Sequence, residues 1–366
     1  MIRRPPRSTL SSSSAASDVY KRQGQASKIT HPKQINLKET ASVLVVMPFT
    51  AGDFILATPA IGALKEAMPP EGRITALISE ETRNLARACA CFDEGRIIKS
   101  ANPGSLISAA AAVISRRYGL FINMEGDTGS SVMAAILSAA KARIAYDRKS
   151  DSRFYNALHN LRLHTLDSPQ HKIVRYLNLV RFIGANSYDF MPRIKLSEED
   201  KQYAAEFVEK NGISKGDTVI GVHPVLKNPG KRWAMNKFSQ LVENLEEKCG
   251  VKVVVFHHRD EKARFKEFMH VARKTQTIAA DTYDYLKLAA ISTYFTCFIC
   301  NETDFMHLLA PFTNLVVIWG EGDPETNRPM GVSHDIIQSA DGIADTVPVS
   351  RVTEAVRKYL NSPPPK

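Results

Sequence analysis

Short, continuous apolar runs that alternate with helix-like stretches restrict the fold of this sequence more than any other feature. The first run, at 43–47, contains apolar residues only, as is typical of a strand buried on both faces of a sheet. Further strands are predicted at 73–78, 96–99 and 120–123, with helices between them. This alternation favours an α/β unit in which helices cover both faces of a parallel sheet.

A second series of the same kind begins after a polar, helix-like segment at 197–211. Two doubly wound units joined by a linker indicate the two-Rossmann architecture called GT-B, in which ligands bind at the carboxyl ends of the strands, facing the interdomain cleft. The predicted strands of the second series are 218–222, 251–256, 295–300 and 315–319, and its helices are 236–248, 260–272, 282–292 and one from 304. The predicted divisions are an amino-terminal Rossmann-like domain (39–190), a linker helix region (191–216), a carboxy-terminal Rossmann-like domain (217–346), and a last helix and tail (347–366).

Residues 1–38 are set apart from both series. Their first two dozen residues are rich in Ser, Arg and Pro, show no periodicity and lack the apolar stretch of a signal peptide. We predict a disordered or artefactual tail there. Residues 1–23 carry +4 of the net charge of +10, which leaves +6 for the rest of the chain. That surplus suits an anionic substrate or an anionic membrane face, and the absence of a nucleic-acid-binding motif argues against nucleic acid as a partner.

The five cysteines form no disulfide framework. Cys297 and Cys300 lie three residues apart on a predicted strand, so their side chains are expected on opposite faces of the sheet. Cys89 and Cys91 lie near a helix end without a partner cluster. Reduced core cysteines favour a cytoplasmic protein, and no apolar run approaches the roughly 18 residues that a membrane-spanning helix needs.

Gly52 and Asp53 lie in the loop after the first strand, at the start of a helical stretch. Gly52 permits close approach of the backbone, and a carboxylate at position 53 can deprotonate a hydroxyl as a general base. The alternative is that Asp53 caps the helix. Slightly downstream, Thr58-Pro59 is predicted to supply an N-cap and a first-turn proline.

The loop that follows the strand at 218–222 begins with His223 and brings together the cations Lys227, Lys231 and Arg232. Three cations near the cleft can neutralise a diphosphate leaving group. The alternative is a solvated basic loop in which Trp233 anchors the next helix.

The loop after the strand at 295–300 leads into a helix that Asn301 or Thr303 can cap. Free N–H groups at a helix amino terminus suit a phosphate, and His307, one turn further on, either faces the cleft or is structural. His257-His258 with Asp260 and Glu261 lacks a third ligand at convincing spacing, so we predict no metal site and no cofactor. Dehydrogenases, P-loop ATPases and α/β-hydrolases are disfavoured because their motifs are absent.

Taken in this order, the loops resemble glycosyltransferase family 9, the ADP-heptose:lipopolysaccharide heptosyltransferases, over roughly residues 41–345. The similarity is carried by six short segments in the family's order. They are Gly52-Asp53 with Ala57-Thr58-Pro59-Ala60; Asn123-Met-Glu-Gly126 with Lys141-Ala-Arg-Ile-Ala; His171 with Tyr176-Leu177 and Phe182-Ile-Gly184; His223-Pro224 with Lys231-Arg-Trp233; Asn301-Glu-Thr-Asp-Phe-Met-His307; and Asp323-Pro324.

The resemblance implies an inverting, metal-independent transfer of heptose or a related sugar from a nucleotide-diphosphate donor, with ADP-heptose expected, to a lipopolysaccharide core acceptor. It implies a cytoplasmic enzyme with a lipid-linked acceptor, in peripheral contact with the inner face of the bacterial inner membrane. Asp53 would be the base, and Lys231 would stabilise the departing diphosphate. The implied donor-binding residues are Gly52, His223, Lys227, Glu261, Thr303, Asp304 and His307, and the implied acceptor-binding residues are Thr50, Glu125 and Arg143.

The sequence departs from the family's pattern at the third loop. Asp304 stands where the family usually has Gly, and Glu302 stands where it has Asp. A carboxylate beside a diphosphate adds repulsion, although an aspartate favours the start of a helix. These departures keep open an alternative, a non-catalytic GT-B protein that binds a nucleotide or a glycan.

Overall fold

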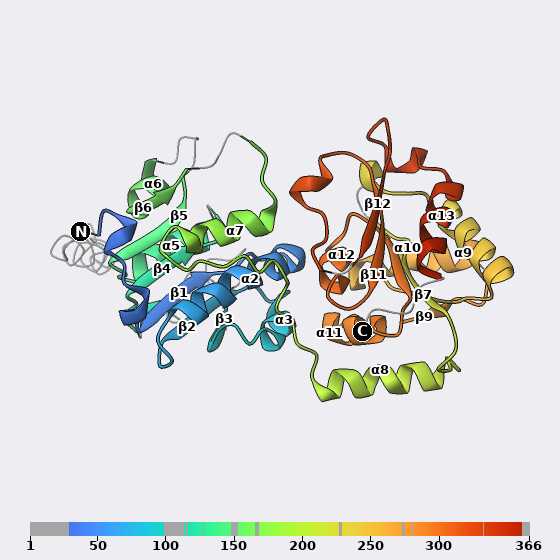
Figure 1. Ribbon diagram of the computed structural model, residues 1–366, viewed down its shortest axis with the longest axis horizontal. Coiled ribbons are helices and arrows are strands. Elements are labelled where there is room, and N and C mark those ends of the chain that lie inside the picture. The colour runs from blue at the N-terminus through green and yellow to red at the C-terminus, as the bar shows by residue number, and fades with distance from the viewer. Residues whose placement is uncertain are drawn as a thin grey trace, which may run out of the picture.

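The protein consists of two α/β units, each built on a six-stranded parallel sheet (Figure 1). The structure is a computed structural model that describes residues 29–98, 113–114, 116–126, 128–147, 153–164, 168–226, 229–272, 275–280, 282–331 and 333–360. Strand order is β3-β2-β1-β4-β5-β6 in the first sheet and β12-β11-β10-β7-β8-β9 in the second. This is the doubly wound arrangement that the sequence predicts, and it confirms the GT-B fold class.

The amino-terminal unit takes its core from strands buried on both faces. Val43 and Val45 of β1 belong to one apolar cluster, whereas Leu44 and Val46 belong to a second cluster on the opposite face. The strands are β1 (Ser42–Val46), β2 (Arg73–Ile78), β3 (Glu94–Ile97), β4 (Leu120–Asn123), β5 (Ala142–Tyr146) and β6 (Leu161–Leu163). The helices are α2 (Ala51–Ala67), α3 (Arg83–Ala88), α5 (Gly129–Leu137), α6 (Arg153–Leu158) and α7 (Lys172–Arg181).

The carboxy-terminal unit repeats this plan. Cys297 packs into one apolar cluster and Cys300 into the other, which confirms that the two side chains point to opposite faces. The strands are β7 (Val219–His223), β8 (Lys252–Val255), β9 (Ile278–Ala279), β10 (Cys297–Asn301), β11 (Asn314–Trp319) and β12 (His334–Gln338). The helices are α9 (Met235–Cys249), α10 (Lys262–Val271), α11 (Tyr285–Ser292), α12 (Asp304–Leu309) and α13 (Val349–Leu360), with 3-10 turns η3 (Pro229–Lys231), η4 (Arg259–Glu261), η5 (Pro324–Thr326) and η6 (Ala344–Thr346).

Four strands escape prediction from the sequence: β5, β6, β9 and β12. Three of them lie toward or at a sheet edge and carry polar residues, and β9 has two residues only. An edge strand is covered on fewer sides, so it lacks the continuous apolar run that marks β1 or β11. Residues 29–38, assigned to the tail, also differ from the prediction. They form the turns η1 (Pro32–Gln34) and η2 (Leu37–Glu39), and the latter buries Leu37.

The start of α2 corrects the predicted role of Thr58-Pro59. The helix begins at Ala51 with Thr50 as its N-cap residue, so Pro59 lies inside the helix. Proline has no N–H, and the Ile55 carbonyl therefore loses its helical donor. The Thr58 hydroxyl donates to that carbonyl at 2.7 Å instead. Thr58-Pro59 is thus a locally compensated pair within a continuous helix and not a helix start.

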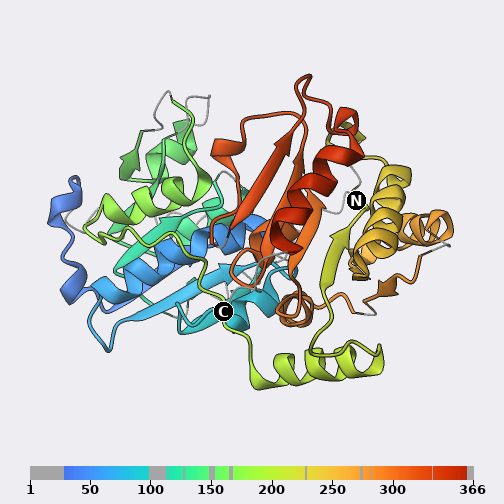
Figure 2. The same ribbon diagram turned by 45° about the vertical axis from the view of Figure 1, so that its right-hand side comes forward.

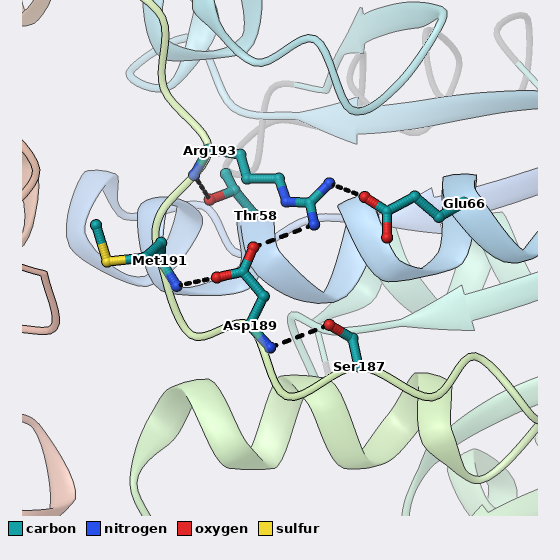
Figure 3. Close-up of polar contacts among 6 residues, drawn as sticks. All are labelled: Thr58, Glu66, Ser187, Asp189, Met191 and Arg193. Atoms are coloured by element: carbon teal, nitrogen blue, oxygen red, sulfur yellow. Dashed lines mark hydrogen bonds and ion pairs between the residues drawn. The ribbon is translucent and has the colours of Figure 1, made fainter.

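The interdomain linker is fastened to α2 through the same threonine (Figure 3). The Arg193 N–H donates to Thr58 Oγ1 at 2.9 Å, and the Arg193 guanidinium binds Glu66 at 2.5 Å and Asp189 at 3.2 Å. A Cβ on Gly62 would lie 2.5 Å from that guanidinium, which explains the glycine on this face of α2. The linker therefore follows the amino-terminal unit before it crosses to the other.

After the linker, α8 (Glu198–Lys210) packs against α11 of the carboxy-terminal unit and runs below it in both views (Figures 1 and 2). Ser197 caps α8 through a capping box with Asp200. The two units meet where α12 contacts α2 and where α11 contacts α3, and one apolar cluster runs through both units. Within the described residues, no helix has the length and apolar character needed to cross a membrane.

Candidate active site

The candidate site lies at the two points where strand order reverses, between β1 and β4 in one sheet and between β7 and β10 in the other. Loops after adjacent parallel strands diverge at such a point and leave a crevice at the carboxyl ends of the strands. The loop after β1 leads into α2 at Thr50, and the segment after β10 leads into α12 at Thr303. The first turns of α2 and α12 face each other across the junction of the units.

A cavity of about 280 Å³ lies at this junction. Both units contribute to its wall, and its polar groups include three carboxylates and one ammonium. The described residues that line it are Thr50, Gly52, Asp53, Lys172, Glu302, Thr303, Asp304, Met306, His307 and Asn327. Six of the predicted site residues are among them, so the structure brings together residues from the first and third loops.

Asp53 lies in the first turn of α2 and forms an ion pair with Lys172, at 2.7 Å between Oδ1 and Nζ. The side chains are 29% and 38% exposed, respectively, although the paired Oδ1 atom is itself buried. The alternative function of Asp53 as a helix cap does not apply, because Thr50 is the N-cap residue and its hydroxyl accepts from the Asp53 N–H at 3.4 Å. The Asp53 carboxylate therefore forms part of the cavity wall, where it contacts Lys172.

Asp304 reaches from α12 to the backbone of Gly52 on the other unit. A Cβ at position 52 would lie deep inside the van der Waals radius of the Asp304 Oδ1 atom. Burial, together with the nearby carboxylates of Glu81 and Asp53, raises the pKa of Asp304 to about 6. Glu81 Oε1 also accepts from the Ala51 N–H at 3.3 Å, so two carboxylates meet the first turn of α2.

Lys231, the cation predicted to meet a diphosphate, is held by Glu302 at 2.6 Å. Glu302 is 13% exposed and accepts a second hydrogen bond from Asn327 at 3.1 Å. The pair fixes the Lys231 ammonium at one side of the cavity and neutralises it. Lys227, predicted to share this function, lies outside the described residues.

His307 and Thr303 line the cavity from α12. His307 is buried, and its pKa is lowered to about 3 by burial, by the nearby ammonium of Lys172 and by His171. The ring is therefore neutral at pH 7. Thr303 is the N-cap residue of α12 but makes no capping side-chain bond, whereas the Asn301 side chain accepts from the Trp233 N–H at 2.9 Å.

His223 and Glu261 form a buried pair at 2.9 Å, beside the cavity and not on its wall. Burial opposes ionisation of Glu261, but hydrogen bonds from His223 and from the His258 N–H lower its pKa overall. His258 packs flat on Phe305, and burial and His223 lower its pKa to about 4. Ligand atoms of His223, His258 and Glu261 lie within 4.8 Å of one another, because β7 supplies the third residue that spacing around 257–261 does not reveal.

The predicted acceptor-side residues are dispersed. Glu125 follows β4 and accepts from the Phe49 N–H at 2.8 Å, and burial and Asp53 raise its pKa. Arg143 lies near the amino end of β5, where its guanidinium donates to the carbonyls of Leu158 and Ala140. Arg143 therefore binds backbone carbonyls at the amino ends of the strands, whereas Thr50 lines the cavity at their carboxyl ends.

Sequence reasoning missed three polar residues of the site: Lys172, Glu81 and Asn327. Lys172 directly follows His171, which caps α7 and bonds the Arg328 carbonyl of the other unit at 2.9 Å. A cation in the first turn of a helix opposes the helix dipole. The position of Lys172 in the sequence was therefore a signal that a negative group lies close to its ammonium.

Residues 107–353 match the family described as glycosyltransferase family 9 (heptosyltransferase). A comparison with curated proteins gave no match.

Solved structures of the same fold are similar at low sequence identity. A glycosyl transferase family 9 protein from Veillonella parvula superposes with a TM-score of 0.78 at 18% identity, covering 89% of this chain and 98% of its own. The E. coli ADP-heptose lipopolysaccharide heptosyltransferase II gives 0.70 at 18% identity, covering 87% and 98%. The E. coli heptosyltransferase WaaC with ADP gives 0.64 at 15% identity, covering 87% and 99%.

Proposed function

Because the chain belongs to glycosyltransferase family 9, we propose that it transfers heptose or a related sugar from a nucleotide-diphosphate donor to a lipopolysaccharide core acceptor. ADP-heptose is the donor that we expect, since similar structures are named for that sugar nucleotide or hold ADP. A lipid-linked acceptor would bring the protein to the inner face of the bacterial inner membrane from the cytoplasm.

The proposed reaction needs a base, an electrophilic sugar carbon and a leaving diphosphate. Asp53 takes the proton of an acceptor hydroxyl while that oxygen attacks the anomeric carbon of the donor. The bond between this carbon and the diphosphate oxygen breaks, and the nucleoside diphosphate leaves with the electron pair. Attack from the face opposite to the leaving group inverts the anomeric centre, and no step requires a metal ion.

The observation that carries the proposal is the position of Asp53. Its carboxylate lines a cavity between the units, partly exposed and within one turn of the amino end of α2. Lys231 lies beside the same cavity and would stabilise the departing diphosphate once Glu302 yields to it. Thr303 and His307 complete the donor side, and Thr50 and Glu125 would meet the acceptor.

Nucleotide release tests the proposal. The purified protein is incubated with a lipid A–inner core acceptor and each of a panel of ADP-, UDP- and GDP-sugars. We expect acceptor-dependent release from one donor and a loss of at least about 100-fold in Asp53→Asn, because general-base catalysis typically contributes that much. Full activity of a folded Asp53→Asn protein would remove Asp53 from the mechanism.

A second candidate, a non-catalytic GT-B protein that binds a nucleotide or a glycan, is favoured by two contacts. Glu302 neutralises Lys231, and Asp304 occupies the amino end of α2. Both place negative charge where a diphosphate would lie. Silence across the donor panel, with nucleotide binding still visible as a thermal shift, would support this candidate.

The variant Asp304→Gly tests how the negative charge of Asp304 affects the affinity for a diphosphate. If a diphosphate binds near α12, removing the Asp304 carboxylate should tighten ADP binding several-fold, since a nearby like charge is removed. Calorimetric titration with ADP measures the change. An unchanged affinity would place the diphosphate elsewhere.

A further inference from the structure

Lys172 is the positively charged residue among the described residues of the cavity wall. Among the described residues of its wall, Asp53, Glu302 and Asp304 are carboxylates, and Lys172 carries the one ammonium. His307 is neutral at pH 7, because burial and the ammonium of Lys172 lower its pKa. A diphosphate that entered this cavity would therefore meet Lys172 as its first positive partner.

Helix α7 does not explain the presence of this lysine. Lys172 is the first residue of α7, where a positive side chain opposes the helix dipole. Its ammonium instead binds Asp53 on α2, and α7 packs extensively against α2. The backbone of α7 is thus firmly placed against α2, while the tip of the lysine projects into the cavity.

The ion pair between Lys172 and Asp53 is exchangeable. Both side chains are about one third exposed, and pairs of this kind contribute about 0–1 kcal/mol because water competes for both charges. A diphosphate carries more negative charge than one carboxylate, so it competes effectively for the ammonium. Lys231, by contrast, is bound to a carboxylate that is 13% exposed and has a second donor in Asn327.

We propose that Lys172 couples donor binding to the freeing of the base. In the free protein its ammonium occupies Asp53 Oδ1, one of the two oxygens that would accept the acceptor's proton. A bound diphosphate draws the ammonium away, and Asp53 is then free to accept that proton. The part of this inference that treats Asp53 as the base rests on the proposed function. The competition between Asp53 and a diphosphate for Lys172 does not depend on sugar transfer.

Binding of inorganic pyrophosphate, measured by titration calorimetry, tests the competition in a double-mutant cycle. Lys172→Gln should weaken binding about tenfold or more, since a charge-assisted hydrogen bond is lost. Asp53→Asn should tighten binding several-fold, because the competitor for the ammonium is removed. In the Lys172→Gln background, Asp53→Asn should tighten binding clearly less than in the wild-type background, because only the loss of a like charge remains and no ammonium is left to be released.

Lys65→Gln is the matched control. Lys65 forms an ion pair with Asp93 at 2.7 Å, with side chains 29% and 32% exposed, in the same unit but away from the cavity. Its loss removes one positive charge without touching the site, and pyrophosphate affinity should stay within about twofold at moderate salt. Far-ultraviolet circular dichroism and thermal unfolding verify that each variant folds.

Two results would overturn the proposal: equal pyrophosphate affinity in wild type and Lys172→Gln, or the same tightening by Asp53→Asn in both backgrounds. The second result would mean that Asp53 acts by repulsion alone. The proposed transferase function fails separately, if no donor of the panel releases nucleotide. If the double-mutant cycle gives the expected coupling but no donor of the panel releases nucleotide, the competition for Lys172 is supported and the proposed sugar transfer is rejected.

Discussion

At the scale of single residues, the ionisation of Asp304 should make stability depend on pH between about pH 4 and 6. Its pKa is about 6 in the folded protein, raised from 3.8 by burial and by the carboxylates of Glu81 and Asp53. The folded state therefore binds more protons than the unfolded state between about pH 4 and 6, and stability is lost as the pH rises through this window. At about 1.4 kcal/mol for each pH unit, the cost above pH 6 reaches up to about 3 kcal/mol.

Asp304→Asn removes this titration and keeps an oxygen for the Gly52 N–H. We expect the variant to unfold at higher urea than wild type at pH 8, with the advantage shrinking to nearly zero at pH 4. Urea unfolding at pH 4, 5, 6 and 8 measures the difference. A stability difference that is constant across these pH values would show that Asp304 does not titrate in this window.

The sequence analysis identified Asp304 as an unusual residue of the site, but it did not predict what the Asp304 side chain contacts. The pattern around 301–307 indicated a helix start with an unusual carboxylate, and the structure agrees. Nothing in the sequence places that carboxylate on the backbone of Gly52, because the contact depends on how two separate sheets are arranged. The same limit applies to Lys172, which finds Asp53 only after α7 packs on α2.

At the scale of elements, the linker depends on one hydroxyl inside α2. Thr58 is fully buried, donates to the Ile55 carbonyl and accepts from the Arg193 N–H. Thr58→Val keeps the shape and removes both bonds, leaving a carbonyl that Pro59 cannot serve. We expect a loss of about 1–3 kcal/mol in the free energy of unfolding and faster hydrogen exchange at Arg193.

Thr58→Ser supplies the control, since it retains the hydroxyl and removes one methyl group. Its exchange rate at Arg193 should stay close to that of wild type, although a small cavity lowers its stability. If both variants exchange alike at Arg193, the hydroxyl does not hold the linker. The sequence pointed to Thr58-Pro59 as a helix start; the continuous burial of residues 54–64 shows why the helix continues through the proline.

At the scale of the whole molecule, the two units are joined by one apolar cluster and by a few polar contacts across the junction. Asn84 donates to Asp284 at 2.9 Å, and His171 bonds the Arg328 carbonyl. They join α3 to the start of α11, and the start of α7 to the segment after η5. The sequence predicted both units, because buried strands leave a strong signal, but the fit of one unit against the other leaves none in a single sequence.

Gly52→Ala tests whether this fit controls the site. Its Cβ would overlap the Asp304 carboxylate and lie 3.2 Å from the ring of the buried His307. The carboxylate would have to turn away and give up its contact with α2, or α12 would have to shift, at a cost of about 1–3 kcal/mol. We expect nucleotide affinity to fall about tenfold and the radius of gyration in X-ray scattering to increase.

Adding Asp304→Gly to Gly52→Ala removes the overlap and should restore both values toward those of Asp304→Gly alone. A double variant that remains as impaired as Gly52→Ala would mean that Gly52 acts through its own backbone, and that the contact with Asp304 does not set the distance between the units.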